Sequence, residues 1–499
     1  MLGKKLEYAR IDNAEKARGI DPKRCHVVML QAATRRIGKV LRRDSHERNK
    51  YRVTAEFLIF TVSPEIPPQH PYLIMRFLAL ASILVLVRGQ VTYQEPSGTI
   101  LRTDNGTYGP PLEEFHYYYD QWPIGLAVSS AGRLFVCYTR GQYAYTLGES
   151  VNKTAEAPYP SAELNLPVSS LNTSYNGIPF GSADSHGLIS VQALYITPKT
   201  ANRDETLWAL DTGRASIMDS QGEVTVPYAQ PGGPKLVGIS LSNNSIYETF
   251  TFPADVHYPD SYMNDVRFDL RSDVTPGGKG VAYIVDSSDE GRPGFIILDL
   301  GTGESWRRLT QDPSVLRVDS DVPSYQGHPF YQRSVGQPVG HLREGLDGIQ
   351  ISPDGRTIYY SPLTGNYLYS VPAANLLARD DDPLAERAAK NNVSNLGQRG
   401  GNANGFEGDS NGLVYQLVPE HNAIYYYDPN DLQTHGYVRD PRILWPDSAS
   451  VGEDGYFYVN INQLPYQPMW NNGQDLRVHP GAVLRAKLPN GGTKIMGVY

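Results

Sequence analysis

The segment LDGIQISPDGRTIYYSP, residues 346–362, is the best guide to the fold of this 499-residue chain. Small, apolar and polar residues precede an Asp354-Gly355 turn, and a run rich in Tyr and Ile follows it. An Asp-Gly pair between two extended runs is a strong signal for a β-hairpin. The segment therefore predicts two antiparallel strands in the inner part of a sheet.

Five other segments have the same plan, with inner segments spaced by about 40 to 85 residues along the chain. They are WPIGLAVSSAGRLFVCY (122–138), HGLISVQALYI (186–196), YMNDVRFDL (262–270), ANGFEGDSNGLVYQLV (403–418) and PDSASVGEDGYFYVNI (446–461). Outer strand pairs follow, such as the one in GFIILDLGTGESWRRL. Because one such unit cannot bury its faces alone, the units have to stack around an axis. The repeats predict an all-β, six-bladed β-propeller with about four strands per blade.

Two expectations concern the ends and the one helical stretch of this ring. An N-terminal strand at Gly98–Arg102 is expected to close the ring by pairing with the last blade, whose outer strand is placed at Ala482–Leu488. Residues 373–390 (AANLLARDDDPLAERAAK) have helical character, but Pro383 interrupts them. Two short helical turns on the surface are therefore predicted there.

The N-terminal region indicates export. Residues 75–89, MRFLALASILVLVRG, have the charged start, the apolar run of about 11 residues and the small-residue exit of a signal peptide cleaved before Gln90. A signal peptide has to begin the chain, so we expect translation to start at Met75. Residues 1–74 are then a non-native leader or gene-model extension, basic and disordered, and residues 90–499 are the propeller. The alternative is that 75–89 form a buried core strand or helix.

Charge, sequons and cysteines agree with an extracellular protein. Residues 1–74 hold 15 Lys and Arg against 8 Asp and Glu, whereas residues 90–499 hold 28 against 45. The acidic body argues against nucleic acid, whose phosphates need Lys and Arg. Glycosylation sequons lie at Asn105, Asn152, Asn172, Asn243 and Asn392. Cys25 lies in the leader and Cys137 in the apolar run RLFVCYT, so the mature chain can form no internal disulfide.

Several of the blade segments carry a family resemblance. LWALDTGR, MNDVRFDLR, EGLDGIQISPDGRTIYYSPL and ILWPDSASVGEDGYFYVNINQLP resemble segments of the major royal jelly protein/yellow family, and they occur in the family's order. The resemblance covers residues from about 113 to 488. It implies a secreted six-bladed propeller with one ligand cavity at the end of the central channel.

The resemblance leaves the activity open because the family is diverse. Some arthropod members bind biogenic amines, some are linked to pigment chemistry and others are nutritional. The low cysteine content is similar to that of fungal members, which include enzymes thought to guide hetero-Diels–Alder cyclisations. We therefore carry three hypotheses: a binding protein for a small, aromatic ligand; a secondary-metabolism enzyme such as a hetero-Diels-Alderase acting on tropolone or quinone-methide intermediates; and a calcium-dependent lactonase-like hydrolase.

The candidate site residues are polar or aromatic groups near the starts of the inner strands. Asn264, Asp265 and Asp347 have a spacing similar to the oxygen ligands of calcium-dependent propeller lactonases, and Asp409, Asp447 and Asn462 could complete a ring of oxygens. Asp and Asn at such positions also commonly tie down turns through bonds to the backbone. Calcium is thus a possible cofactor, and no other is indicated.

The remaining candidates come from two aromatic or amide-rich stretches and two blade entrances. Asn402, Asn404 and Phe406 in GNANGF correspond to a cavity-lining stretch of amine-binding relatives, although the stretch could be only an interblade loop. His186 and Tyr262 lie at blade entrances. Residues 116–122 (HYYYDQW), including Trp122, could hold a planar ligand or cation, or could pack the first blade against its neighbour. No nucleophile–base motif is present, so the catalytic residues, the ligand and the oligomeric state stay unknown.

Overall fold

The computed structural model describes residues 92–95, 98–101, 105–139, 143–165, 174–175, 178–179, 186–201, 203–218, 224–379 and 382–499. Residues 106–499 form one compact unit. The hairpin of β1 (Thr92–Glu95) and β2 (Gly98–Leu101) belongs to a second unit and is described by itself. The proposed leader and signal peptide, residues 1–74 and 75–89, lie outside the described residues.

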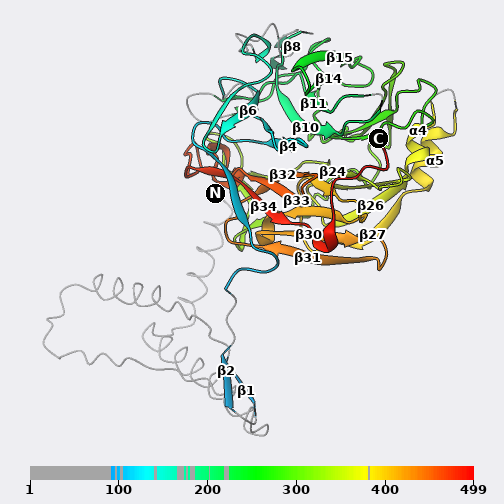
Figure 1. Cartoon of the computed structure of the whole chain (residues 1–499). Helices are drawn as coiled ribbons and strands as arrows, with labels where there is room; N and C mark the ends of the chain where they lie inside the picture. The colour runs from blue at the N-terminus through cyan, green and yellow to red at the C-terminus, as the bar shows by residue number, and fades with distance from the viewer. Residues whose placement is uncertain are drawn as a thin grey trace, which may run out of the picture. The chain divides into compact units, whose positions relative to one another are not determined.

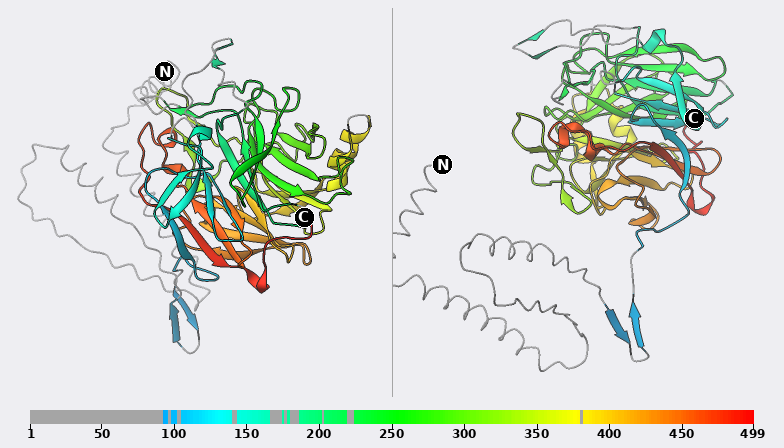
Figure 2. Two further views of the ribbon diagram at one scale, coloured as in Figure 1. Left: turned by 45° about the horizontal axis from the view of Figure 1, so that its top comes forward. Right: turned by 90° about the vertical axis from the view of Figure 1, so that its left-hand side faces the viewer.

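Within residues 106–499 the described strands build six four-stranded antiparallel sheets, which follow one another around a ring (Figures 1 and 2). Blade one is β4 (Gly125–Val128), β5 (Leu134–Cys137), β6 (Leu147–Asn152) and β7 (Ala155–Pro158). Blade two is β10 (Val191–Thr197), β11 (Thr206–Asp211), β14 (Lys235–Ser240) and β15 (Ser245–Thr251). Blade three is β16 (Met263–Asp269), β17 (Val281–Asp286), β18 (Gly294–Asp299) and β19 (Ser305–Arg308).

The other three blades repeat the pattern. Blade four is β24 (Leu346–Ile351), β25 (Thr357–Pro362), β26 (Tyr367–Pro372) and β27 (Ser394–Gln398). Blade five is β28 (Phe406–Gly408), β29 (Val414–Val418), β30 (Ala423–Asp428) and β31 (Gln433–Arg439). Blade six is β32 (Pro446–Val451), β33 (Tyr456–Ile461), β34 (Gly481–Lys487) and β3 (Glu113–Tyr118). The predicted six-bladed propeller is confirmed, and the innermost strands are those of the six quoted segments.

The strand that closes the ring is not the predicted one. β3, Glu113–Tyr118, pairs with β34 and forms the outer strand of blade six, whereas Gly98–Leu101 pairs with β1. The sequence EEFHYY explains why β3 fits there, because its His116 and Tyr118 are buried while Glu113 and Glu114 stay exposed. Gly98–Leu101 therefore does not take part in closure, and β34 is the third strand of its blade.

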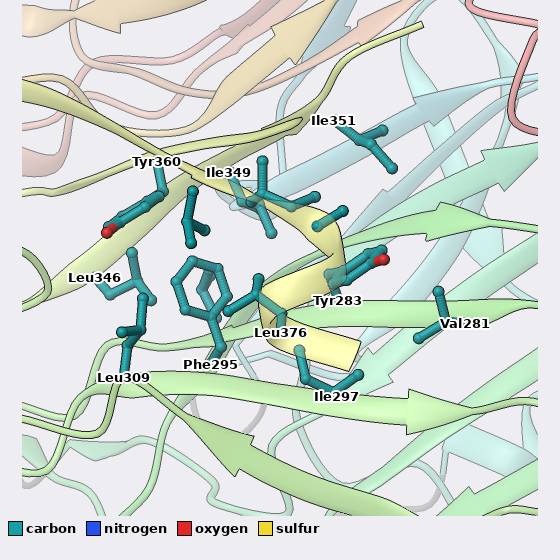
Figure 3. Packing of buried hydrophobic residues seen from close by; sticks show 14 of the residues in the cluster. Val281, Tyr283, Phe295, Ile297, Leu309, Leu346, Ile349, Ile351, Tyr360 and Leu376 are labelled. Atoms are coloured by element: carbon teal, nitrogen blue, oxygen red, sulfur yellow. The ribbon is translucent and has the colours of Figure 1, made fainter. Parts of the chain in front are cut away.

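Six clusters of buried apolar side chains hold the blades together, one cluster between each pair of neighbouring blades. Between blades three and four, for example, Phe295 and Ile297 face Leu346, Ile349 and Tyr360 (Figure 3). The predicted helical turns also appear, as α4 (Ala373–Leu377) and α5 (Ala385–Asn391) on either side of Pro383. They pack on blade four through Leu376 and Ala389. No helix among the described residues is long and apolar enough to cross a membrane.

Short elements lie in the connections between strands. They are the hairpins β8 (Ser174–Tyr175) with β9 (Ile178–Pro179), β12 (Ile217–Met218) with β13 (Val224–Thr225), β20 (Ser324–Tyr325) with β21 (His328–Pro329), and β22 (Tyr331–Gln332) with β23 (Gly340–His341), and the turns η2 (Glu163–Asn165), η3 (Pro419–His421), η4 (Leu464–Tyr466), η5 (Pro468–Trp470) and η6 (Pro489–Gly491). The connections 309–345, 440–445 and 462–480 pack against one another through Phe330, Trp445 and Trp470. This packing forms a seventh apolar cluster beside the start of blade six.

Candidate functional site

A cavity of about 330 Å³ lies at the end of the ring axis where the innermost strands begin. All six blades contribute to it, because every innermost strand runs in the same direction along the axis. The connections 309–345 and 462–480 form part of its wall through Leu342, Leu464 and Met469. Its volume is at the small end of the range for ligand pockets, so a single small molecule would fill it.

Nine of the eleven candidate ligand-binding residues line this cavity. They are Trp122, Tyr262, Asn264, Asp265, Asp347, Asn404, Phe406, Asp447 and Asn462. They come together because the start of each innermost strand faces the same end of the axis. The residues are spread over some 340 positions of sequence, from 122 to 462.

The two other candidates lie outside the cavity. His186 is exposed at the entrance to blade two. Asn402 is buried, and its side-chain amide donates to the Leu363 carbonyl at 3.1 Å and to Asp321 at 3.1 Å. Asn402 thus ties blade five to the loops of blade four, as an interblade residue would.

Asp347, on β24, is the least compensated acid of the cavity. It is 5 % exposed, and its carboxyl has no hydrogen-bond or ion-pair partner among the described residues. Burial raises its pKa well above the ordinary value, and repulsion from Asp447 and Asp265 raises it further. Both effects favour the protonated carboxyl, which can donate a hydrogen bond to a ligand or exchange its proton for a cation.

Asp447 and Asp265 complete a group of three carboxyls near the axis. The Asn404 amide donates to Asp447 at 2.5 Å, yet burial still raises the pKa of Asp447 to about 7. Burial also raises the pKa of Asp265, although Arg267 lies 2.8 Å away and opposes the shift. Two of the three carboxyls, Asp347 and Asp447, therefore have no cationic side chain bound to them in the described structure.

Amide groups form a hydrogen-bonded chain along one wall. The Tyr262 hydroxyl donates to Gln192 Oε1 at 2.7 Å, and Gln192 Nε2 donates to Asn264 Oδ1 at 3.0 Å. On another wall, Asn462 accepts from the Leu464 amide through Oδ1, but its buried Nδ2 has no partner. A buried amide donor left unpaired is costly unless a ligand or water accepts from it.

Aromatic rings form much of the remaining surface. Trp122 stacks on His479 with ring centroids 4.4 Å apart, and Arg477 lies 5.0 Å from the same indole. Trp445 lines the cavity with a backbone φ of 64°, a left-handed conformation that bulky residues rarely adopt. Strain of this kind is concentrated at ligand sites. Tyr143 and Trp445 were not among the sequence-based candidates, because nothing in their local pattern distinguishes them from core residues.

A second group of acids lies at the wall formed by blades three and four. Burial raises the pKa of Glu344 to about 7 and that of Asp289 to about 6, in the latter case with repulsion from Glu290. Glu290 itself is paired with Arg214 at 2.8 Å. Sequence reasoning missed these acids because they lie in loops, although Glu344 stands only three positions before Asp347 in EGLDG.

Asp409 and His116 have structural roles. Asp409 lies away from the cavity and accepts from Tyr415 at 2.9 Å and from the amides of its own hairpin turn. His116 is buried against Glu156 at 2.5 Å, which joins β3 to the outer strand of blade one. Of the stretch 116–122, Trp122 lines the cavity, next to Pro123 and Ile124, which follow it in the chain.

The possible metal and modification sites can be placed as follows. No group of three or more His, Cys, Asp or Glu side chains arranged to hold a metal ion occurs among the described residues. Cys137 is free and buried. The sequon residues Asn105, Asn152, Asn243 and Asn392 are exposed, while Asn172 lies outside the described residues. Exposure is necessary for glycosylation but does not by itself indicate it.

Comparisons with solved structures find distant propellers. A luciferin-regenerating enzyme is 12 % identical over 78 % of this chain and 99 % of its own, with a TM-score of 0.42. A gluconolactonase from Xanthomonas campestris is 12 % identical over 76 % and 89 %, with a TM-score of 0.36. A calcium-binding regucalcin from Agrobacterium tumefaciens is 14 % identical over 64 % and 96 %, with a TM-score of 0.35. No similarity of this strength bears on activity.

The sequence comparison is more specific. No curated protein matches the chain. The family model described as major royal jelly protein matches residues 190–472, which is more than half of the chain and runs from blade two into blade six. With six blades in the expected order, the chain belongs to the major royal jelly protein family.

Proposed function

We propose that this protein, once secreted, binds a small organic cation with an aromatic ring in its axial cavity. The observation that carries the proposal is Asp347, a buried carboxyl with no partner, which faces the same cavity as Asp447 and several aromatic rings. Aromatic faces and carboxylates together attract ammonium groups, and the attraction grows when the site is desolvated.

The balance of charge in the cavity supports a cationic ligand. Six carboxyls line it, from Asp265, Asp289, Glu290, Glu344, Asp347 and Asp447. Its two cationic side chains are already bound, since Arg267 pairs with Asp265 and Arg214 pairs with Glu290. An ammonium ligand would let one of the two carboxyls, Asp347 or Asp447, ionise without leaving an uncompensated charge.

The test compares 2-phenylethylammonium with 2-phenylethanol, which has the same ring and length but no charge, by isothermal titration calorimetry. We expect the ammonium to bind at least tenfold more tightly, and Asp347→Asn to remove that preference. His186→Gln, outside the cavity, is the matched control and should bind as the unchanged protein does. Equal binding of the two compounds, or an undiminished preference in Asp347→Asn, would refute the proposal.

The pH dependence gives a second readout. Because the pKa of Asp447 is about 7 in the empty cavity, a bound cation must displace a proton. Affinity for the ammonium should therefore rise between pH 5.5 and pH 8. Below the pKa of Asp447, the rise should be on the order of tenfold per pH unit for each proton released. Titrations in buffers of different ionisation enthalpy would count the released protons.

A hetero-Diels-Alderase is the second candidate, favoured by the raised pKa of Asp347 and the unpaired Asn462 Nδ2. Both could donate to a carbonyl or quinone-methide oxygen and orient a reactive substrate, which is the main requirement for cycloaddition. Tropolone is a suitable probe. Tropolone binding would weaken as pH rises, because the carboxyl loses the proton that it donates. Its affinity therefore changes with pH in the opposite direction to that of a cationic ligand. The lactonase hypothesis has no supporting cluster among the described residues, and added calcium should leave the melting temperature unchanged.

A further inference from the structure

The segment that follows β34 crosses the ring at the end opposite the cavity. The Ser410 amide donates to the Thr493 carbonyl at 2.8 Å, and the Leu270 amide donates to the Val498 carbonyl at 2.7 Å. The Tyr499 hydroxyl meets that of Tyr195 at 2.7 Å. These contacts lie at or toward the far ends of the innermost strands of blades five, three and two. In Figure 1 this red segment runs from the last blade to the mark of the C-terminus among the green strands.

Lys494 in this segment places a buried ammonium in the channel. The residue is 5 % exposed, and its Nζ lies 4.9 Å from the centre of the Tyr195 ring. It donates no hydrogen bond and forms no ion pair with a described residue. Burial lowers the pKa of Lys494, and the largest attraction opposing this shift comes from Glu407. A cation on an aromatic face beside a buried carboxylate is the arrangement by which proteins recognise ammonium groups.

Arg267 lies between the Lys494 side chain and the ligand cavity. Its guanidinium contacts Asp265 at 2.8 Å on the cavity side and Glu407 at 3.6 Å on the other, and it also donates to the Phe406 carbonyl. Opposite charges thus alternate along the axis from Lys494 to Glu407, Arg267 and Asp265. The salt-bridged Arg267 therefore lies between Lys494 and the carboxyls of the ligand cavity.

Packing alone does not account for a lysine here. The neighbouring Ile495 and Val498 already fill the apolar gap between blades three and four. An apolar side chain at position 494 would avoid the desolvation that a buried ammonium suffers. The Tyr195 ring and the Glu407 carboxyl offset that cost for a cation at position 494, and Arg267 contacts the same two groups.

We propose that the far end of the axial channel is a second ammonium-binding site, which the chain fills with its own Lys494. Its ligand class is a primary alkylammonium, either a lysine side chain or a free amine of similar length. The site does not depend on the function proposed for the ligand cavity.

Chemical rescue tests this site in the full chain. Lys494→Ala vacates it, and the melting temperature should fall by several degrees. Millimolar n-butylammonium should restore at least half of that loss, while n-butanol, equal in length but uncharged, should not. The melting temperature of the unchanged protein should not rise when n-butylammonium is added. Lys487→Ala is the matched control, because Lys487 lies 3.9 Å over the Tyr456 ring but on the exposed surface.

Further variants separate this site from the cavity. Rescue should persist in Lys494→Ala with Asp347→Asn, which disables the cavity, and disappear in Lys494→Ala with Glu407→Gln. Equal rescue by n-butanol would show that the variant leaves an apolar cavity with no preference for an ammonium group, and would overturn the proposal. The absence of any rescue would overturn it as well. If Lys494→Ala folds poorly, the yield of soluble refolded protein with each additive gives the same comparison.

Discussion

Asp447→Asn should make this protein more stable at alkaline pH while damaging its cavity. Asp447 is a half-buried residue of the cavity wall, and burial raises the pKa of its carboxyl from 3.8 to about 7. In the unfolded chain the same carboxyl ionises near pH 4. The folded protein therefore holds a proton that the unfolded chain releases, so stability is highest below pH 4 and falls as pH rises to about 7.

The size of the effect follows from that shift. A difference of about three pKa units corresponds to about 4 kcal/mol at pH 8, and water in the cavity reduces the effect to about 2–4 kcal/mol. Asn is isosteric with the protonated acid and can still accept the hydrogen bond from Asn404. It keeps the packing and removes the penalty, so the variant should gain this amount at pH 8 and nothing at pH 4.

Equilibrium urea unfolding of both proteins at pH 4 and pH 8 measures the gain. Asp354→Asn is the control, because Asp354 lies in an exposed turn where the Ser352 hydroxyl lowers its pKa. That variant should show no gain as pH rises. A gain for Asp447→Asn of the same size at both pH values, or no gain at pH 8, would refute the reasoning that an ionisation penalty is stored at this position.

Three other changes have defined outcomes. His257 is buried with both ring nitrogens unpaired, and burial lowers its pKa to about 4. The free energy of unfolding that is lost between pH 6.5 and pH 4, measured by urea unfolding, should therefore be about 2–3 kcal/mol smaller for His257→Leu than for the unchanged protein. Arg267→Met leaves Asp265 and Glu407 buried without their cation, and should cost about 3–5 kcal/mol in chemical unfolding at neutral pH. Gly348→Ala would place a Cβ 2.6 Å from the Phe406 ring, so it should cost about 1–3 kcal/mol and weaken ligand binding, as calorimetry would show.

Local sequence was sufficient to predict the blades. In the turns of the inner hairpins, Gly355 and Gly412 have φ of 73° and 82°, which glycine adopts without strain, so short-range turn chemistry sets each hairpin without help from distant residues. The repetition of that unit then implied the ring, because a single four-stranded sheet leaves apolar faces uncovered. The helical turns around Pro383 follow in the same way from a local rule.

The closing strand could not be chosen from local signals. Gly98–Leu101 and Glu113–Tyr118 both have strand-forming sequences, but only the second has His116 and Tyr118 on the face that meets blade one. Which candidate closes the ring depends on the partner surface across the gap. That surface is made by β34 of blade six and by blade one, which lie side by side only in the closed ring.

The sequence by itself determined the six blades and the strand starts where a ligand would be held, because turn chemistry and alternation act within a few residues. Only the tertiary structure decided which polar groups share a site. It brought Asp347 beside Asp447 without an ion-pair partner, bound Asn402 to blade four, and added Glu344 and Trp445 to the cavity. It also placed Lys494 on Tyr195 across the channel. These meetings depend on distance through space and on burial, which change pKa values and leave donors unpaired, and neither quantity is encoded in local sequence.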